Sequence, residues 1–191
     1  MPKSSRTIEV QTEFTPNPHS LKFNVNCPLL DKGSVYFDSK VAAKASPLAA
    51  KFFEIPKIES VLIGQGFVTI TRDAALDTWG ALIDPVTQVL QEHLAEPNAV
   101  IVSDSSVLNA GGKPKSEVEK KIMQVLDAYI RPAIARDGGD IIFHGFKEGV
   151  VTLHLQGACS TCPSSMATLK AGVERMLCEY VSEVKEVVQL G

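Results

Sequence analysis

One stretch organises the chain: Gly157-Ala158-Cys159-Ser160-Thr161-Cys162-Pro163-Ser164-Ser165. It follows an alternating apolar run, which is typical of a strand, and it precedes apolar residues at helical spacing. Pro163 suits the first position of that helix, and the two serines after it strengthen the signal for a helix start. The stretch therefore places two thiols, Cys159 and Cys162, where a strand gives way to a helix.

A helix N-terminus favours the ionised form of a thiol. Its unpaired N–H groups and the positive end of its dipole stabilise thiolate over thiol. Thiolate binds soft metals and attacks disulfides, so the position suits metal or redox chemistry. The other residues at 157–161 are small. From side-chain size alone we expect an exposed site, from which a bound group can be passed on.

The composition is that of an ordinary globular protein. Of the 191 residues, 45% are hydrophobic and 21% are charged, which is enough apolar material for a core. The net charge of −3 and the scattered basic residues give no electrostatic surface for nucleic acid. No apolar run approaches the roughly 20 residues that span a bilayer. Residues 1–10 lack the apolar segment of a signal peptide.

These features predict a soluble intracellular protein. Reducing compartments keep thiols reduced, so metal binding or redox work is a better interpretation of the four cysteines than a disulfide framework.

The first half of the chain predicts strands and helices in one compact unit, residues 1–95. Alternating apolar residues indicate the strands, Ser46 before Pro47 indicates a helix start, and Gly64-Gln65-Gly66 indicates a hairpin turn. The expected elements are strands at 6–13, 21–25 and 34–37, a helix from Ser46, strands at 58–63 and 67–71, and a helix over 78–94.

The second half predicts a separate unit in the order α-β-β-α-β. Residues 96–115 are rich in Ser, Gly and Pro and are expected to be a flexible linker. The expected elements of the second domain, residues 116–191, are a helix capped by Ser116, strands at 141–146 and 150–155, a helix over 164–180 and a closing strand at 184–190. The fold class is therefore α+β, with two small two-layer domains.

Two cysteines do not complete a metal centre. An iron–sulfur cluster or a tetrahedral zinc site takes about four protein ligands. Cys178 lies on the helix that follows the thiols, but at 1.5 Å per residue it is roughly 22 Å along the axis, too far to share one centre. Cys27, in the other domain, is expected to fill space as a small apolar residue. His144 and His154 lack ligand spacing to the thiols and are expected to be ordinary strand residues.

The simplest route to four thiolates is two chains. Each chain would donate Cys159 and Cys162 across a symmetric contact. Cluster binding and dimerisation are then expected to be coupled.

The Cys-x-x-Cys spacing alone leaves alternatives open, since it occurs in zinc modules, thiol oxidoreductases and cluster proteins. A thiol–disulfide oxidoreductase would use the same pair, but a hairpin directly upstream does not give the βαβ order of a thioredoxin-like fold. A zinc-stabilised module would lack a second ligand pair within the chain. Inert packing is the least favoured interpretation, because a loop rich in glycine and serine offers no core.

Motifs in both halves resemble one family. Asp137-Gly138-Gly139-Asp140, the stretch at 157–165 and the run Thr168–Leu177 are similar to the C-terminal domain of NifU-like (Nfu) iron–sulfur proteins. Gln11–Phe23 and Ser46-Pro47-Leu48-Ala49 resemble the N-terminal domain of its two-domain members. The resemblance covers nearly the whole chain, apart from residues 1–5 and the linker.

The resemblance implies a carrier or scaffold, not an enzyme. In the family the cysteine pair, here Cys159 and Cys162, binds a [4Fe–4S] cluster that is usually bridged between two protomers. The cluster is received from upstream assembly proteins and passed to apo-proteins. A [2Fe–2S] form is left open. The family's N-terminal domain provides no ligands and serves contacts with donors or targets. Eukaryotic members act in mitochondria, whereas the short N-terminus here is more similar to a bacterial cytoplasmic member or to a processed mature form.

Overall fold

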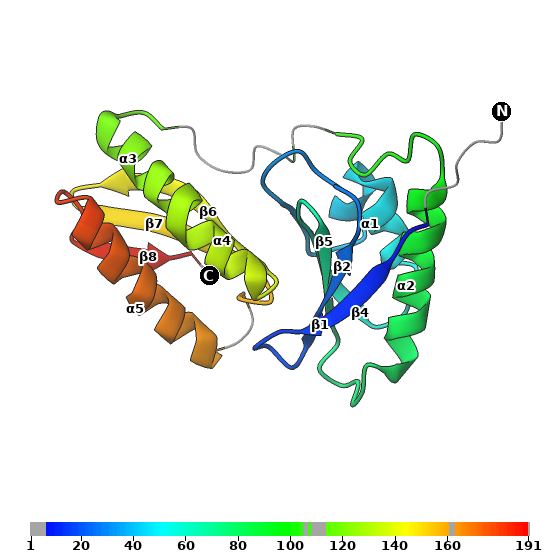
Figure 1. The fold of residues 1–191 in the computed structure, drawn as a ribbon. Coiled ribbons are helices and arrows are strands. Elements are labelled where there is room, and N and C mark those ends of the chain that lie inside the picture. The colour runs from blue at the N-terminus through cyan, green and yellow to red at the C-terminus, as the bar shows by residue number, and fades with distance from the viewer. Residues whose placement is uncertain (1–6, 105–106, 108–113, 161–162, 191) are drawn as a thin grey trace.

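The computed structural model describes residues 7–104, 107, 114–160 and 163–190, and these residues form two sheets with separate cores (Figure 1). The first sheet has five strands in the order β1-β2-β5-β4-β3, and the second has three in the order β6-β7-β8. Each sheet carries helices from its own part of the chain, so the expected α+β class with two units is confirmed.

The first unit forms largely at the predicted positions. Ser46 begins α1, because its side chain accepts a hydrogen bond from the backbone N–H of Ala49 at 3.0 Å and Pro47 occupies the first helical position. The elements are β1 (Val10–Phe14), β2 (Ser20–Val25), β3 (Val35–Phe37), η1 (Ala42–Ala45), α1 (Pro47–Phe52), β4 (Ile58–Ile63), β5 (Phe67–Arg72) and α2 (Gly80–Ala95).

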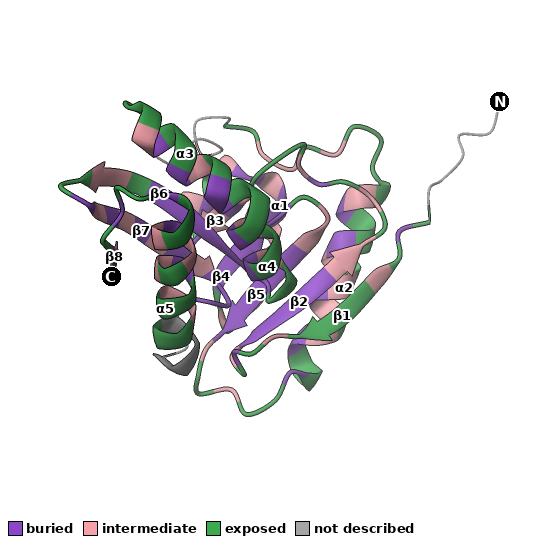
Figure 2. Cartoon of the chain, turned by 60° about the vertical axis from the view of Figure 1, so that its left-hand side comes forward, coloured by how far each residue is buried: buried purple, intermediate pink, exposed green. Residues whose placement is uncertain are grey.

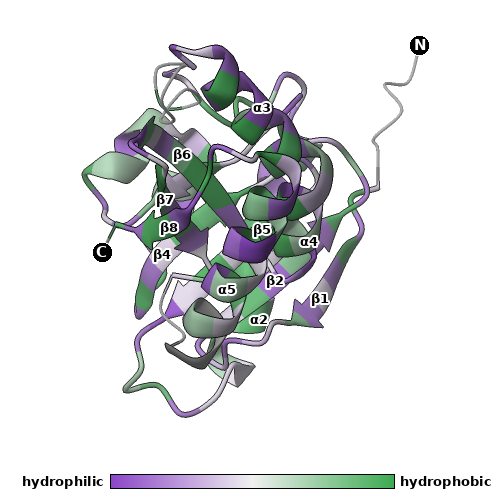
Figure 3. Cartoon of the chain, turned by 90° about the vertical axis from the view of Figure 1, so that its left-hand side faces the viewer, coloured by the Kyte–Doolittle hydropathy of each residue, from purple (hydrophilic) through white to green (hydrophobic). Residues whose placement is uncertain are grey.

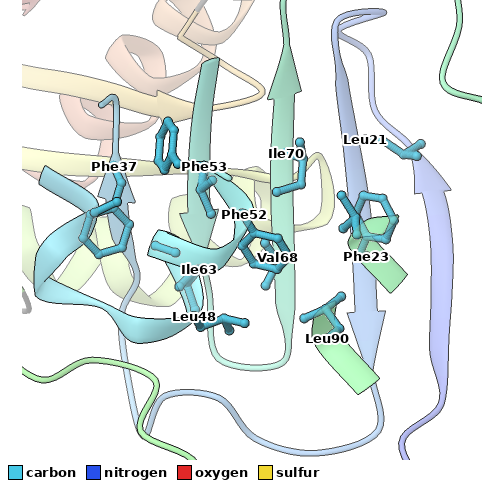
Figure 4. Close-up of a cluster of buried hydrophobic side chains, with 14 of the residues drawn as sticks. Leu21, Phe23, Phe37, Leu48, Phe52, Phe53, Ile63, Val68, Ile70 and Leu90 are labelled. Carbon is cyan, nitrogen blue, oxygen red and sulfur yellow. The ribbon is translucent and has the colours of Figure 1, made fainter. Parts of the chain in front are cut away.

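The first core lies between the five-stranded sheet and the helices α1 and α2. Alternation along the central strands turns one set of apolar side chains toward the helices, among them Phe23 from β2 and Ile70 from β5 (Figure 4). Phe52 and Leu90 meet them from α1 and α2. Figure 2 shows β2, β4 and β5 largely buried, whereas the edge strand β1 is mostly exposed.

The second unit packs all its helices on one face of a three-stranded sheet. The core positions alternate along β6 and β7, for example Phe143 and Leu153, and meet Ile122 and Leu177 from the helices. The elements are α3 (Glu117–Val125), the π-helical turn η3 (Leu126–Ile130), α4 (Arg131–Arg136), β6 (Gly139–Lys147), β7 (Val150–Gly157), α5 (Pro163–Tyr180) and β8 (Glu186–Gln189). Figure 3 shows hydrophobic and hydrophilic bands alternating along these helices.

The sheet is mixed, with β6 antiparallel and β8 parallel to β7. The predicted first helix of this unit is divided. Its π-helical turn lies just before Pro132, which lacks the N–H that a regular helix would use.

Part of the expected linker lies on the first unit. The backbone N–H of Ser103 donates to the carbonyl of Ala45 at 2.8 Å, and Ile101 and Val102 pack partly against the first core. The reason is the apolar run at 99–102, which gains by covering the core. Within the described part of the chain, no helix is both long and apolar enough to cross a membrane.

Replacing Phe23 with Ala should lower the free energy of unfolding of the first unit by about 3–5 kcal/mol, because the ring is fully buried and its removal leaves a cavity. The chain has one tryptophan, Trp79, which packs in the first core, so urea unfolding followed by tryptophan fluorescence reports on this unit. The matched control is Phe14→Ala, where the ring is 82% exposed and the change should stay within about 0.5 kcal/mol. Equal effects of the two variants would contradict this account of the core.

Candidate functional site

Cys159 lies in the loop between β7 and α5, the strand-to-helix junction that the sequence predicts. β7 ends at Gly157 and α5 begins at Pro163. The loop turns back on itself, since the Ser160 hydroxyl donates to the Gly157 carbonyl at 2.8 Å and the Ser160 N–H donates to it at 3.1 Å. Cys162 lies outside the described residues, so its position stays a prediction. We call residues 157–160 the cysteine loop.

The expectation of an exposed site is wrong for Cys159, which is only 6% exposed and belongs to the second core. Gly139, at the start of β6, contributes to this burial. A Cβ at Gly139 would lie 2.6 Å from the sulfur of Cys159, so the missing side chain is what makes room for the thiol. Small residues around a cysteine thus allow the neighbouring backbone to close over it, as well as allowing solvent in.

Cys159 also lines a cavity of about 580 Å³ between the η3–α4 segment and α5. Most of the wall is apolar, and Pro16 of the first unit contributes to it. The lining residues are Pro16, Tyr129, Ile130, Ala133, Ile134, Asp137, Ala158, Cys159, Thr168, Leu169, Gly172, Val173 and Met176. Cys159 therefore borders a partly open, mainly apolar hollow.

The turn between β1 and β2 of the first unit reaches the cysteine loop (Figure 1). Asn17, which is 2% exposed, donates from Nδ2 to the carbonyl of Ala158 at 3.0 Å. The turn holds this side chain in place, since the Thr15 hydroxyl donates to the Asn17 carbonyl at 2.9 Å and the Asn17 Oδ1 accepts the N–H of His19 at 2.9 Å. The sequence indicates a turn here, but nothing in it reveals this contact.

A row of three cross-strand neighbours on the first sheet lies against the second unit. In register, Lys22 of β2 and Leu62 of β4 flank Thr69 of β5. Lys22 Nζ donates to the carbonyl of Arg136 at 3.1 Å. All three side chains are buried, although they lie on the face opposite the helices and the first core.

Two glycines of the second unit face this row. Gly138 and Gly157 have φ of +76° and +68°, where an L side chain is strained. Space is also absent. A Cβ at Gly138 would lie 2.9 Å from the Thr69 hydroxyl, and one at Gly157 would lie 2.6 Å from Leu62 Cδ2. These positions combine a left-handed backbone with a close approach of two chain segments.

Asp140 is a further contact between the units. Its carboxylate accepts a hydrogen bond from the Ser34 hydroxyl of the first unit and one from the N–H of Ile141 at 2.7 Å. Arg131 Nη1 lies 3.8 Å from the same carboxylate. The residue is 6% exposed, so a buried acid is satisfied by partners from both units.

The other sequence candidates lie elsewhere. Cys27 packs at the edge of the first core and Cys178 at the edge of the second, both half-buried. His144 and His154, on neighbouring strands, have ring centroids 6.1 Å apart in an edge-to-face arrangement. Among the described residues no three His, Cys, Asp or Glu side chains gather as a metal site.

Two family models match the chain. The NifU-like domain matches residues 122–188, and the Nfu/NifU N-terminal domain of scaffold proteins matches residues 10–97. The chain is 38% identical over 185 residues to the human protein named NFU1 iron-sulfur cluster scaffold homolog, mitochondrial, covering 97% of this chain and 73% of the human one. It is 40% identical to the Drosophila willistoni protein of that name, of which it spans 64%, less than two thirds.

A solution structure of a NifU-like protein from Saccharomyces cerevisiae is 27% identical, with a TM-score of 0.48, and covers 55% of this chain and 92% of that one. The sequence matches define the class: the chain belongs to the Nfu family of iron–sulfur cluster scaffold proteins. Within that family it is of the two-domain type, with an Nfu N-terminal domain followed by a NifU-like domain.

The pKa of Glu13 lies below its ordinary value of 4.5, first because the side chain of Asn24 donates to it and second because of Lys22. A lowered pKa in the folded state means that the contact stabilises the fold above the ordinary pKa and that this stability is lost as the pH falls through the lowered value. Asn24→Ala should raise the pKa of Glu13 toward 4.5 in an NMR carboxyl titration. Asp73, whose pKa is lowered by the N–H of Ala75 and by Lys57, is the control that should not move. An unchanged Glu13 would contradict the assignment.

Gly157→Ala should destabilise the fold by about 1–2 kcal/mol or more, because the residue has a left-handed backbone and Leu62 occupies the space of a Cβ. Gly172→Ala is the matched control. It lies inside α5 with no other atom within 4 Å of a built Cβ, so alanine there should stabilise by about 0.5–1 kcal/mol. Urea unfolding followed by far-UV circular dichroism measures both, and opposite signs are expected.

Proposed function

We propose that this chain is an iron–sulfur cluster scaffold that binds its cargo through Cys159 and Cys162 and delivers it to apo-proteins. The observation that carries the proposal is the position of Cys159 at the junction of β7 and α5, inside the stretch that matches the NifU-like domain. Cys162 follows three positions later in the same match. The role is that of a carrier and not of an enzyme.

Cysteine is suited to this cargo. Thiolate sulfur is the ligand that iron–sulfur clusters use. Delivery then consists of ligand exchange, in which thiolates of the acceptor replace those of the carrier. A chain that supplies only two thiolates has fewer bonds to give up than a chain that supplies four.

The cargo is shared between two chains in this proposal. A cluster takes about four protein ligands. Cys27 and Cys178 pack against the edges of the two cores, and the described residues hold no three-membered ligand group. The remaining two thiolates would come from the same pair in a second copy, so that a [4Fe–4S] cluster and a dimer form together. A [2Fe–2S] form fits the same ligand set.

We infer the compartment from the names of the relatives. The human and Drosophila willistoni relatives are named mitochondrial, which supports a mitochondrial location for this chain, and the matrix is the part of the mitochondrion that we propose. The bacterial cytoplasm, the other expectation from the sequence, gains no support from these comparisons. The upstream donors and the acceptors are the iron–sulfur assembly and apo-proteins of that compartment.

The test is reconstitution without oxygen. The chain, supplied with iron and sulfide, should take up both and gain visible absorption, and the loaded chain should restore an apo-acceptor. Cys159→Ser and Cys162→Ser should each lower the bound iron at least about tenfold, since each removes a thiolate from every chain of the shared site.

Cys27→Ser and Cys178→Ser are the matched controls and should keep the wild-type iron content. A double variant at 159 and 162 that still held a full cluster would refute the proposal. A colourless chain that reduces disulfides would favour the oxidoreductase instead, and stoichiometric zinc would favour a zinc module.

A further inference from the structure

The first unit covers the cysteine loop. Asn17 binds the carbonyl of Ala158, the residue directly before Cys159, and Pro16 closes part of the cavity that Cys159 lines. Leu62 packs at Gly157, two residues before the thiol. In this arrangement Cys159 is 6% exposed, which leaves little of the residue for a bulky group held by a second chain to contact.

The surface of the first unit that contacts the second unit is largely polar, as expected of a contact that can open. Apart from Leu62, the buried side chains on the sheet face that meets the second unit carry hydroxyl groups and an amine, from Ser20, Lys22, Ser60, Thr69 and Thr71. Polar side chains of this kind regain water when they are exposed, so separation costs far less than opening an apolar core. The opposite face of the same sheet, which holds the first core, is apolar throughout its centre.

The Thr69 hydroxyl group would gain a hydrogen-bond partner if the two units separated. The Thr69 hydroxyl is buried and has no hydrogen-bond partner within the described part of the chain. It lies against Gly138, at one of the close contacts between the two units. An unpaired buried hydroxyl opposes the closed arrangement, because water would satisfy it on separation.

The chain between the units allows separation. The contacts of the first unit continue past residues 103–104, which bind the carbonyl of Ala45, to Val107, which packs partly against the first core, and α3 begins at Glu117. Fully extended, residues 108–115 could span roughly 26–29 Å. That reach lets the first unit leave the loop while the two units stay joined.

We propose that the first unit is a reversible cover of the cysteine loop, which must move off Cys159 before two chains can share a cluster. This inference rests on the proposed function for its purpose, but the cover itself is a property of the chain without cargo. The closed arrangement protects the thiol of a single chain. The open arrangement exposes Cys159 to a second copy or to the thiolates of an acceptor.

The experiment measures the alkylation rate of each cysteine in the full chain, without iron, using iodoacetamide and mass spectrometry of fragment ions that separate Cys159 from Cys162. The opening variant combines Asn17→Ala, which removes the hydrogen bond to Ala158, with Leu62→Glu, which buries a charge if the cover closes. Its matched control is Thr12→Glu, which adds the same charge to an exposed position of β1 in the same sheet.

The expected result is that Cys159 reacts at least about tenfold faster in the opening variant than in the wild type or in Thr12→Glu, because reactivity follows the population of the open form. Cys27 and Cys178 should keep their rates within about twofold, since local opening leaves both cores intact. If the alkylation of Cys27 is also faster in the opening variant, Leu62→Glu has unfolded the first unit. The alkylation rate of Cys159 is then compared between the wild type and Asn17→Ala alone.

Equal rates at Cys159 in the wild type and in a folded opening variant would overturn the cover. Because no cluster is involved, this outcome is separate from a failure of the scaffold function. A chain that shows the rate difference but binds no iron would keep the cover and lose the proposed cargo.

Discussion

The contact between Thr69 of the first sheet and the backbone at Gly138 sets the arrangement of this molecule. The approach is so close that a Cβ at Gly138 would meet the Thr69 hydroxyl at 2.9 Å. Leu62, next to Thr69 in register, makes the equivalent approach to Gly157. Glycine is needed at both positions for two reasons at once, a left-handed backbone and the lack of room.

This contact determines the environment of the candidate site. Gly138 precedes β6 and Gly157 ends β7, so the first unit rests on the two strand ends that flank Cys159. The carbonyl of Gly138 in turn accepts the N–H of Ala158 at 3.1 Å, which joins these strand ends to the cysteine loop. A displacement of the first unit therefore acts directly on the residues that hold the thiol. The proposed scaffold function and the proposed cover are linked through this geometry.

Much of the fold follows from local signals in the sequence. The cap at Ser46, the glycine turn at 64–66 and the alternation along β6 and β7 each predict an element that the structure contains. Such signals suffice because capping, turn geometry and alternation act over a few residues. The junction of strand and helix at the cysteine loop is predictable for the same reason.

The burial of the site could not be predicted in this way. Lys22, Thr69 and Thr71 alternate with apolar residues, a pattern that normally indicates a face in water. Their burial comes from another part of the chain, far away in sequence, as does the burial of Cys159 by Gly139. Small residues near a thiol are compatible with an open loop and with close packing, and only the tertiary structure distinguishes the two.

The central claim is that one chain holds half of a cluster site. Native mass spectrometry of the anaerobically loaded wild-type chain tests it most directly, because it counts chains, iron and sulfide in one species. The account predicts that each cluster is carried by a pair of chains and that a single chain carries none. A single chain that retains a complete cluster by itself would contradict it.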